Sequence, residues 1–411
     1  MSYNDAIEYL YSSRPPFHKV GAAAYKPGLD NTLRLLAHFG NPHEQLRTIH
    51  IAGTNGKGST SHLIAAALQA SGLKVGLFTS PHLVSLTERI RINGTPISEK
   101  EVAVFIEQNR AFLDELQPSF FETMTAMAFD YFARMRVDIA VVEVGLGGRL
   151  DSTNVISPLL SVITNIGLDH TEFLGTTLSQ IAKEKAGIIK PNVPVVIGES
   201  DPETKMVFEK RAQECNAPIY FADECEYLRR CRRKFAPDCE LHGLYQEHNL
   251  QTAFVALRAL KITNSAIKEG FAQVCSMTGL RGRWEILCHQ PLTICDTGHN
   301  SHGIKYVAQQ LKDLTNPAVY IVFGMVNDKD TDAVMKMLPA GEKYHYIFTA
   351  PNTDRARSAQ EMLALWDKKG LAIENPTEAI HYAQSHAAKE DAIFIGGSNY
   401  LVGDAISLFT H

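Results

Sequence analysis

The chain has 411 residues, of which 45% are hydrophobic and 21% are charged, with 40 Lys and Arg against 45 Asp and Glu. At roughly 150 residues per domain, this length predicts two or three domains whose cores need neither disulfides nor a structural metal. The net charge of −5 argues against a protein that binds nucleic acid or an anionic membrane mainly by charge. We therefore predict neither partner.

The sequence lacks the features of membrane-inserted and exported proteins. It has no run of about 18 apolar residues, which a transmembrane helix would need. Its first residues include Asp5 and Glu8 where a signal peptide would be apolar. Seven widely spaced cysteines without a C-x-x-C pair are typical of reduced thiols. We predict a cytoplasmic protein.

Apolar runs of strand length alternate with helical patterns in the first half of the chain. We predict strands at 47–53, 74–80, 137–145, 159–167 and 193–199, and helices at 59–72 and 120–135. Several of these strands are continuously apolar, which is typical of parallel strands buried on both faces. The alternation predicts a doubly wound α/β sheet.

A second α/β series follows near the end of the chain. We predict strands at 291–298, 318–325, 344–350 and 391–397, and helices at 301–314 and 332–339. The stretch 279–290 is interpreted as the junction, which predicts domains at 1–283 and 284–411. The second domain is expected to be a smaller, Rossmann-like α/β domain.

A cysteine-rich and locally basic stretch precedes this junction. It contains Cys215, Cys225, Cys231 and Cys239. A zinc site is one interpretation, but the gaps of five and seven residues match no common pairing of zinc ligands. The basic residues within 226–235 are interpreted as a solvated face, with an anion-binding patch as the alternative.

The strongest single motif is a glycine-rich loop between a predicted strand and a predicted helix. Gly53, Gly56 and Gly58 allow a tight turn and a close backbone approach to phosphate. Lys57 is predicted to contact phosphate oxygens and Ser59 to ligate Mg²⁺. The loop is shorter than the usual G-x-x-x-x-G-K-[ST], and Gly58 separates the lysine from the hydroxyl. A purely structural turn is the alternative.

The motifs resemble one enzyme family in their sequence and in their order. GTNGKGST at 53–60 resembles the ATP loop of the Mur ligase superfamily, and TSPHLVSLTERIRING at 79–94 is similar to the folate-binding loop of the folylpolyglutamate synthase branch. The other matching segments are FETMTAMAFDYF, EVGLGGRLDSTN, NIGLDHTEFLG, IAKEKAGIIK, DTGHNSHG and FGMVNDKD. Bacterial members of this branch are commonly bifunctional dihydrofolate synthase/folylpolyglutamate synthases.

The resemblance implies a P-loop-type ATPase domain followed by a ligase domain, with the active site in the cleft between them. It implies that the residues contacting ATP are Gly53, Thr54, Asn55, Gly56, Lys57, Gly58, Ser59, Thr60, Gln246, Asn249, Arg283 and Asp296. Gln246 and Asn249 match the family's adenine-contacting G-x-H-Q-x-x-N, but Tyr245 replaces its histidine. A helix start capped by Asn249 is the alternative.

Two Mg²⁺ ions are expected. Glu143 ends a predicted buried strand, where α/β proteins place ligand chemistry, and its carboxylate suits Mg²⁺ as the Ser59 hydroxyl does. The resemblance adds His170 and Lys185 as ligands of the second ion, although His170 alone would be interpreted as a structural hydrogen-bonding residue. Asp169 is expected to orient its imidazole or to cap a helix.

Lys185 alone would be interpreted as a surface lysine on a helix. The resemblance implies that it is carbamylated, which requires a neutral amine. Lys183 lies two residues away and therefore on a different helix face.

The remaining site residues follow from the resemblance. Ser80, Pro81 and His82 are expected to cover the pterin-bearing substrate and Asp151 to contact the pterin, with an Asx cap as the alternative for Asp151. Phe121 either stacks on the pterin or packs in the core. The catalytic residues implied are Lys57, His170, Lys185, Arg283 and His299; a surface arginine is the alternative for Arg283. Asp328 and Lys329 are assigned to glutamate binding or domain closure.

We therefore predict a monomeric, ATP-dependent ligase that adds L-glutamate to dihydropteroate and to reduced folates through an acyl phosphate. Three alternatives remain: a monofunctional folylpolyglutamate synthase, a cell-wall peptide ligase of the same superfamily, and a P-loop regulatory protein without ligase activity. A dinucleotide-binding protein is disfavoured, because Gly145-x-Gly147 is followed by Leu150 where the fingerprint needs Gly or Ala.

Overall fold

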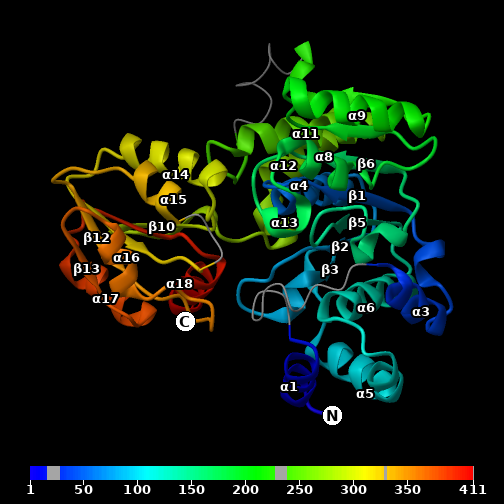
Figure 1. The fold of residues 1–411 in the computed structure, drawn as a ribbon, viewed down its shortest axis with the longest axis horizontal. Coiled ribbons are helices and arrows are strands. Elements are labelled where there is room, and N and C mark those ends of the chain that lie inside the picture. The colour runs from blue at the N-terminus through cyan, green and yellow to red at the C-terminus, as the bar shows by residue number, and fades with distance from the viewer. Residues whose placement is uncertain (16–27, 227–237, 328–330, 411) are drawn as a thin grey trace. The chain divides into compact units, whose positions relative to one another are not determined.

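The computed structural model describes residues 1–15, 28–226, 238–327 and 331–410 (Figure 1). The chain forms two compact units: Met1–Glu240 with Gln246–Leu280, and Leu241–Tyr245 with Arg281–His411. Each unit has its own sheet and its own core. The domain limits of 1–283 and 284–411 remain a prediction about the functional division of the chain.

The first unit is built on an eight-stranded sheet with the order β4-β3-β2-β5-β1-β6-β7-β8. Its strands are β1 (Thr48–Ala52), β2 (Val75–Phe78), β3 (Ile90–Ile92), β4 (Thr95–Pro96), β5 (Ile139–Glu143), β6 (Leu160–Ile163), β7 (Val195–Ile197) and β8 (Ile219–Phe221). Every residue of β1, β2, β5, β6 and β7 is buried. Successive side chains point to opposite faces, so both faces are covered and the predicted doubly wound sheet is confirmed.

The helices of this unit surround that sheet. They are α1 (Tyr3–Ser13), α3 (Asp30–His38), α4 (Lys57–Ala70), α5 (Glu99–Leu116), α6 (Phe120–Arg134), α7 (Thr171–Leu174), α8 (Leu178–Ala186), α9 (Pro202–Glu214), α11 (Gln246–Ala259), α12 (Asn264–Ala272) and α13 (Val274–Thr278). Short 3₁₀ turns are η2 (Pro42–Gln45), η3 (Leu86–Arg89), η4 (Ser152–Val155) and η5 (Ala222–Glu224). Figure 1 shows α11 and α12 beside α4, and the three helices contact one another.

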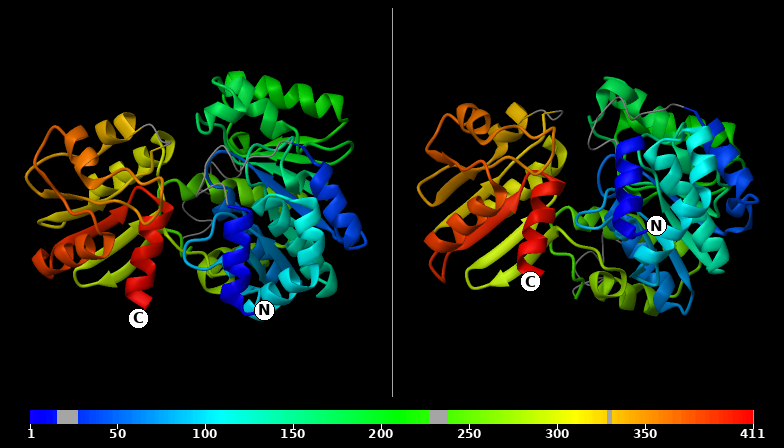
Figure 2. Two further views of the ribbon diagram at one scale, coloured as in Figure 1. Left: turned by 60° about the horizontal axis from the view of Figure 1, so that its bottom comes forward. Right: turned by 90° about the horizontal axis from the view of Figure 1, so that it is seen from below.

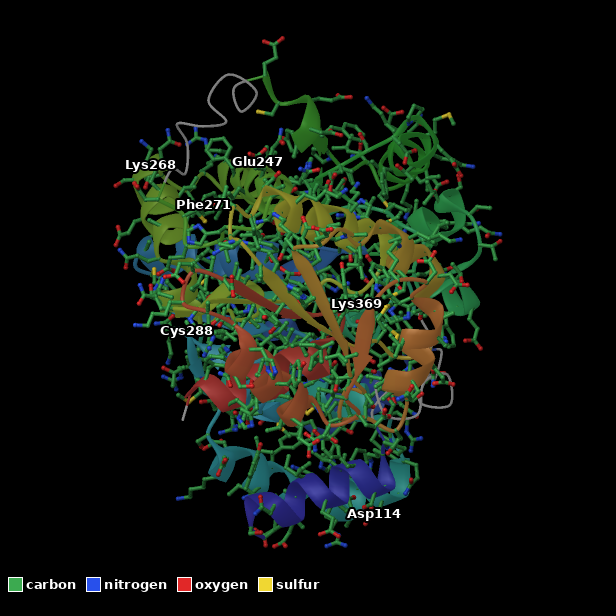
Figure 3. The ribbon with its side chains drawn as sticks, turned by 90° about the vertical axis from the view of Figure 1, so that its left-hand side faces the viewer. Asp114, Glu247, Lys268, Phe271, Cys288 and Lys369 are labelled. Carbon is green, nitrogen blue, oxygen red and sulfur yellow. The ribbon has the colours of Figure 1, made fainter. Side chains whose placement is uncertain are left out.

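The first helix is anchored to the long helix α5, alongside which it lies in Figure 2. The Tyr9 hydroxyl donates to the carboxylate of Asp114, which Figure 3 labels. Arg14, whose side chain is buried, donates through Nη2 to the carbonyl of Leu113 at 2.6 Å. These contacts hold the start of the chain against the folded unit.

The second unit contains a six-stranded sheet with the order β13-β12-β11-β14-β10-β9. Its elements are β9 (Arg283–His289), β10 (Leu292–Asp296), α14 (Ser301–Asp313), β11 (Val319–Phe323), α15 (Thr331–Met337), β12 (Tyr344–Phe348), α16 (Ala359–Leu365), β13 (Gly370–Ala372), α17 (Pro376–His386), β14 (Ala392–Gly396) and α18 (Asn399–Thr410). All pairings are parallel except that of β9 with β10. The predicted Rossmann-like domain is thus confirmed.

The stretch 279–290 was interpreted as the junction, and the two units divide within it, between Leu280 and Arg281. The sequence did not predict that most of this stretch forms β9, which pairs antiparallel with β10 and carries Cys288, labelled in Figure 3. Only Trp284 on this strand is fully buried. An edge strand with so few buried positions lacks the continuous apolar pattern by which the other strands were found.

The short segment Leu241–Tyr245 belongs to the second unit because α14 holds it. The side-chain amide of Gln310 accepts the N–H of Leu244 at 2.9 Å and donates to the carbonyl of His242 at 3.2 Å. One amide therefore satisfies two backbone groups of the segment.

The contact between α4 and α12 requires a glycine. A Cβ atom on Gly270 would lie 2.4 Å from the nitrogen of Ala67, so the two backbones touch there. On α12, Figure 3 also labels Phe271, which is buried, and Lys268, which is exposed.

We predict that Gly270→Ala destabilises the protein by about 1–3 kcal/mol. The backbones of α4 and α12 touch at Gly270, and they cannot move apart without disturbing α4. The control is Gly303→Ala on α14, where the added Cβ would lie no closer than 3.4 Å to a neighbour. Thermal unfolding should show a lower Tm for Gly270→Ala only. Equal Tm values for the two variants would contradict the close helix contact.

Candidate active site

Three loops meet at one edge of the first sheet. β1, β5 and β6 are parallel neighbours, and the chain leaves them at Ala52, Glu143 and Ile163. The carboxyl edge of a parallel sheet is where α/β proteins bind ligands. The glycine-rich loop, the predicted metal ligand Glu143 and the segment before His170 all begin there.

Gly53 occupies a position that admits no side chain. Its φ is +148°, and a Cβ would lie 1.8 Å from Oγ1 of Thr164 at the end of β6. Its carbonyl accepts hydrogen bonds from Nζ of Lys57 at 3.0 Å and from Nζ of Lys185 at 2.9 Å. Two lysine side chains therefore meet on one backbone oxygen, and Lys57 also donates to the carbonyl of Thr54.

Lys185 is buried, with 4% of its surface exposed, and is not the surface lysine that its local sequence suggests. Burial and the nearby Lys57 ammonium lower its pKa to about 7. Lys183, two residues away, is exposed. Of the two lysines only Lys185 is buried, and its role and its modification remain predictions.

The loop that follows β5 packs on the helix that carries Lys185. A Cβ on Gly148 would lie 2.8 Å from the carbonyl of Glu184 and 3.0 Å from Cα of Lys185. Arg149 donates its backbone N–H to Glu184 at 2.8 Å and pairs with the same residue's carboxylate at 3.0 Å. The glycines at 145–148 therefore make a tight turn against α8.

The loop after β6 holds the backbone of the glycine-rich loop. The backbone carbonyl and the side-chain Oδ1 of Asn165 accept the N–H groups of Thr54 and Asn55, each at 2.9 Å. Thr164 donates from its hydroxyl to the carbonyl of Asn55 at 2.6 Å. Asn165 was not predicted as a site residue; its signal in the sequence is a polar residue two positions after the buried strand β6.

The helix after the loop begins at Lys57, two residues earlier than predicted. Its N-cap is Gly56, with φ +78° and no side-chain cap. The first N–H groups of a helix have no partner within the helix and favour an anion. Gly58 and Ser59 lie in this first turn, and the side chains of Ser59 and Thr60 are both buried. The geometry suits the predicted phosphate loop.

Gln246 and Asn249 lie directly on this loop, and both are buried. Nε2 of Gln246 donates to Oγ of Ser59 at 3.2 Å, and Nδ2 of Asn249 donates to Oε1 of Gln246 at 2.8 Å. A Cβ on Gly56 would lie 2.1 Å from Oδ1 of Asn249. Because α11 begins at Gln246, Asn249 lies inside the helix and is not the cap that the alternative interpretation suggested.

Glu143 is 2% exposed, and its Oε2 accepts the N–H of Ser80 at 3.1 Å. The predicted metal ligand therefore contacts the predicted folate loop, in which Pro81 is exposed. Arg89 donates from Nε to Nδ1 of His82 at 2.8 Å.

The same loop is held in shape from within. The carboxylate of Glu88 accepts the backbone N–H groups of three consecutive residues, Leu83, Val84 and Ser85, at 2.7–2.9 Å. Phe121 stacks on Phe78 with 5.7 Å between ring centroids, which is the core packing that was one of its two interpretations.

Asp151 is buried, and its carboxylate accepts the N–H groups of Leu146 at 2.8 Å and of Thr153 at 3.0 Å. Burial raises the pKa of this carboxyl. The second contact makes Asp151 the N-cap of η4, which is the Asx-cap alternative. Contact with a pterin remains a prediction.

His170 precedes α7 with φ +50°, and Oδ1 of Asp169 accepts its backbone N–H at 2.9 Å. Asp169 thus contacts the main chain of the residue it was predicted to orient. The role of His170 as a metal ligand remains a prediction.

The other predicted residues lie in the second unit. Asp296 is 1% exposed and accepts the Tyr245 hydroxyl at 2.6 Å and the N–H groups of Trp284 and Gly298 at 2.8 and 2.7 Å. Burial and the Asp296 charge raise the pKa of Tyr245 well above its ordinary value. Tyr245, whose role the sequence left open, therefore positions the Asp296 carboxylate.

Two further predicted residues lie nearby in the chain: Arg283 begins β9, and His299 lies in the loop after β10. Arg283 donates from Nη1 to the carbonyl of Gly282 at 3.2 Å and to the hydroxyl of Thr297. Nδ1 of His299 lies 2.9 Å from the carbonyl of Thr297. Arg283 is half-buried rather than a fully exposed surface arginine.

The side chains predicted to bind Mg²⁺ do not form a complete metal site by themselves. In the described part of the chain, no group of three or more His, Cys, Asp and Glu residues could hold a metal ion. Ser59, Glu143, His170 and a carbamylated Lys185 would instead be completed by phosphate and water oxygens, the ligands that Mg²⁺ prefers. The buried carboxylate of Glu143 and the buried amine of Lys185 fit that arrangement.

Several predictions fall partly outside the described residues. Asp328, Lys329, Cys231 and residues 227–235 of the basic stretch are among the residues the structure does not describe. Within residues 1–15, 28–226, 238–327 and 331–410, no helix is long and apolar enough to cross a membrane.

Known proteins resemble this chain over its whole length. Residues 51–251 match the Mur ligase middle domain, and residues 282–399 match the Mur ligase glutamate ligase domain. The chain is 34% identical to dihydrofolate synthase/folylpolyglutamate synthase of Bacillus subtilis (strain 168), over 98% of each protein.

Solved structures agree with that relationship. Mycobacterium tuberculosis folylpolyglutamate synthase complexed with ADP has a TM-score of 0.87 at 30% identity, covering 100% of this chain and 98% of that one. Bifunctional folylpolyglutamate synthase/dihydrofolate synthase from Yersinia pestis, complexed with AMPPNP and Mn ion, has a TM-score of 0.85 at 27% identity, with coverage of 100% and 98%.

The chain therefore belongs to the Mur ligase family. Within that family it belongs to the dihydrofolate synthase/folylpolyglutamate synthases, so the resemblance found in the sequence is confirmed.

The depressed pKa of Lys185 makes a prediction about stability. The unfolded chain keeps this lysine protonated up to about pH 10.5, whereas the folded protein releases the proton near pH 7. Within that window the unfolded state binds more protons, so the wild type gains stability as pH rises and loses it as pH falls toward 7. We predict that the stability of Lys185→Met does not show this rise with pH.

The difference in Tm between Lys185→Met and the wild type should therefore be largest near pH 7, at several degrees, and shrink as pH rises to 10. The measurement is thermal unfolding in CO₂-free buffers. Lys183→Met, which changes an exposed lysine on the same helix, is the control and should follow the wild type at every pH. Parallel profiles for the two variants would contradict a neutral, buried Lys185.

Proposed function

We propose that the protein is an ATP-dependent ligase that adds L-glutamate to dihydropteroate and to reduced folates. The observation that carries the proposal is the buried Lys185 amine on the carbonyl of Gly53, at the base of a glycine-rich loop. The names of the relatives, dihydrofolate synthase and folylpolyglutamate synthase, support the choice of substrates.

The reaction must make a carboxylate reactive toward an amine. An oxygen of the acceptor's carboxylate attacks the γ-phosphorus of ATP, and ADP leaves with the electrons of the broken P–O bond. The α-amine of glutamate then attacks the carbonyl carbon of the acyl phosphate and loses a proton. Phosphate leaves with the oxygen that came from the carboxylate, and an amide remains.

The loop 53–60 would hold the phosphates through its backbone N–H groups and Lys57. To reach them, Lys57 would exchange the carbonyls of Gly53 and Thr54 for phosphate oxygens. Gln246 and Asn249 would lie beside the adenine, and Asp296 would bind the nucleotide from the second unit. Lys57, Arg283 and His299 would stabilise the charge of the transferring phosphoryl group.

Two Mg²⁺ ions are part of the proposal. Ser59 and Glu143 would hold the first, and Glu143, His170 and Lys185 the second. Bound Mg²⁺ neutralises phosphate charge and orients the oxygens that react. The relative from Yersinia pestis, which is complexed with AMPPNP and Mn ion, supports a divalent ion beside the nucleotide.

Lys185 would serve as a metal ligand after carbamylation. The ammonium group first loses one proton, and the neutral amine then attacks CO₂ and loses a second proton, which leaves an anionic carbamate. Its lowered pKa keeps about half of the amine neutral near pH 7. The conversion would also remove the repulsion between Lys185 and Lys57.

The proposal also covers the residues that bind the acceptor, the partners of the protein and its location in the cell. Ser80, Pro81 and His82 would cover the acceptor, and Asp151 would accept hydrogen bonds from the pterin ring, which favours activity with dihydropteroate. The partners would be small molecules alone, and the protein would act as a cytoplasmic monomer.

The direct test is phosphate release with Mg·ATP and L-glutamate, comparing dihydropteroate, a reduced folate monoglutamate and no acceptor. We predict release with both acceptors, and a loss of at least about 100-fold in kcat for Lys57→Ala. Lys183→Ala is the matched control and should keep wild-type activity.

Release with one acceptor alone would establish a monofunctional enzyme. Folded, ATP-binding protein whose phosphate release responds to neither acceptor would contradict the proposal. Peptide acceptors linked to UDP would then be tested next.

A further inference from the structure

A buried histidine lies on the strand that leads into the ATP loop, and the proposed reaction does not use it. His50 is 0% exposed in the middle of β1. Burial and the charge of Lys190 lower its pKa to about 3, so the ring is neutral at physiological pH. Its Nε2 lies 2.8 Å from Oγ1 of Thr153.

The direction of this hydrogen bond follows from its neighbours. The hydroxyl of Thr153 has a single hydrogen, which it donates to Oδ1 of Asp151. His50 must therefore carry its one proton on Nε2 and donate it to Thr153. Nδ1 of His50 has no hydrogen-bond partner among the described residues, as an unprotonated nitrogen in an apolar setting can.

The chain of hydrogen bonds ends on a carboxylate that is held from both sides. Oδ1 of Asp151 accepts from the hydroxyl and the backbone N–H of Thr153, and Oδ2 accepts from the N–H of Leu146. Leu146 lies in the glycine-rich turn after β5, three residues beyond Glu143. The carboxylate thereby joins η4 to the loop that packs on Lys185.

We propose that His50 and Thr153 are positioning residues for Asp151, which set the orientation of its carboxylate toward the pterin ring of the acceptor. The proposal rests on the proposed function, because it deepens the role of Asp151 there. Without the Thr153 hydroxyl, Asp151 loses one of the donors that fix its plane, and the His50 N–H is left buried without a partner. A carboxylate that can rotate binds the fixed hydrogen-bond donors of a ring less tightly. It also discriminates less well between rings.

Substitutions of Thr153 test this role. Thr153→Val removes the hydroxyl at nearly constant volume, and Thr153→Ser keeps it. The control is Thr48→Val, which changes a buried threonine two residues from His50 on the same face of β1. The Thr48 hydroxyl has no hydrogen-bond partner among the described residues.

Steady-state kinetics should separate positioning from general destabilisation. We expect Thr153→Val to raise KM for dihydropteroate about tenfold, while KM for ATP stays within about twofold of wild type. Thr153→Ser and Thr48→Val should resemble wild type. An unchanged KM for dihydropteroate in Thr153→Val, or equal rises in both KM values, would overturn the proposal.

A second variant tests the proposal if Thr153→Val does not fold, and NMR tests the hydrogen-bond chain without the need for turnover. If Thr153→Val does not fold, His50→Leu, which leaves the Thr153–Asp151 contact in place, should raise the same KM about threefold. Nitrogen-15 NMR of the free wild-type protein should show His50 as the Nε2–H tautomer without titration between pH 5.5 and 8. An Nδ1–H tautomer would overturn the hydrogen-bond chain even if no acceptor is turned over, whereas wild-type inactivity with every acceptor contradicts the proposed function instead.

Discussion

One backbone oxygen constrains the whole site of the first unit. The carbonyl of Gly53 accepts hydrogen bonds from both Lys57 and Lys185, which places the half-buried Lys57 beside the buried Lys185. Burial and the charge of Lys57 both disfavour the ammonium form of Lys185, so an anion bound here would relieve the repulsion between the two lysines. In the proposed function, a nucleotide phosphate or a carbamate formed from CO₂ on Lys185 would be such an anion.

The sheet makes this contact possible. β1 lies between β5 and β6 and is parallel to both, so the loop after β1 meets the other two loops although they follow about a hundred residues later in the chain. Each loop then braces another. Asn165 holds the ATP loop, Gly148 lets the next turn rest on the helix of Lys185, and Asp151 ties that turn to β1 through Thr153 and His50. Catalytic groups on such braced loops need little reorganisation when substrates bind.

The elements of the fold could be predicted wherever burial leaves a periodic trace in the sequence. The continuous apolar runs identified β5, β6 and β7, whereas the half-exposed edge strand β9 has no such run and was not predicted as a strand. The site residues divide in the same way. Glu143 follows from its place at the end of a buried strand, whereas the contact of the buried Lys185 is with Gly53, 132 residues earlier in the chain, which no local pattern contains. The roles of Tyr245, Asn165 and His50 likewise depend on partners that are distant in the sequence.

The most direct test of the account follows one oxygen atom. Dihydropteroate labelled with ¹⁸O in its carboxylate would be incubated with the protein, Mg·ATP and L-glutamate, and the released phosphate would be analysed by mass spectrometry. The account predicts one ¹⁸O atom in each phosphate, because the carboxylate oxygen stays on phosphorus when the amine displaces it. Unlabelled phosphate would mean that water attacks ATP, which would contradict an acyl phosphate and with it the central claim that this site activates a carboxylate.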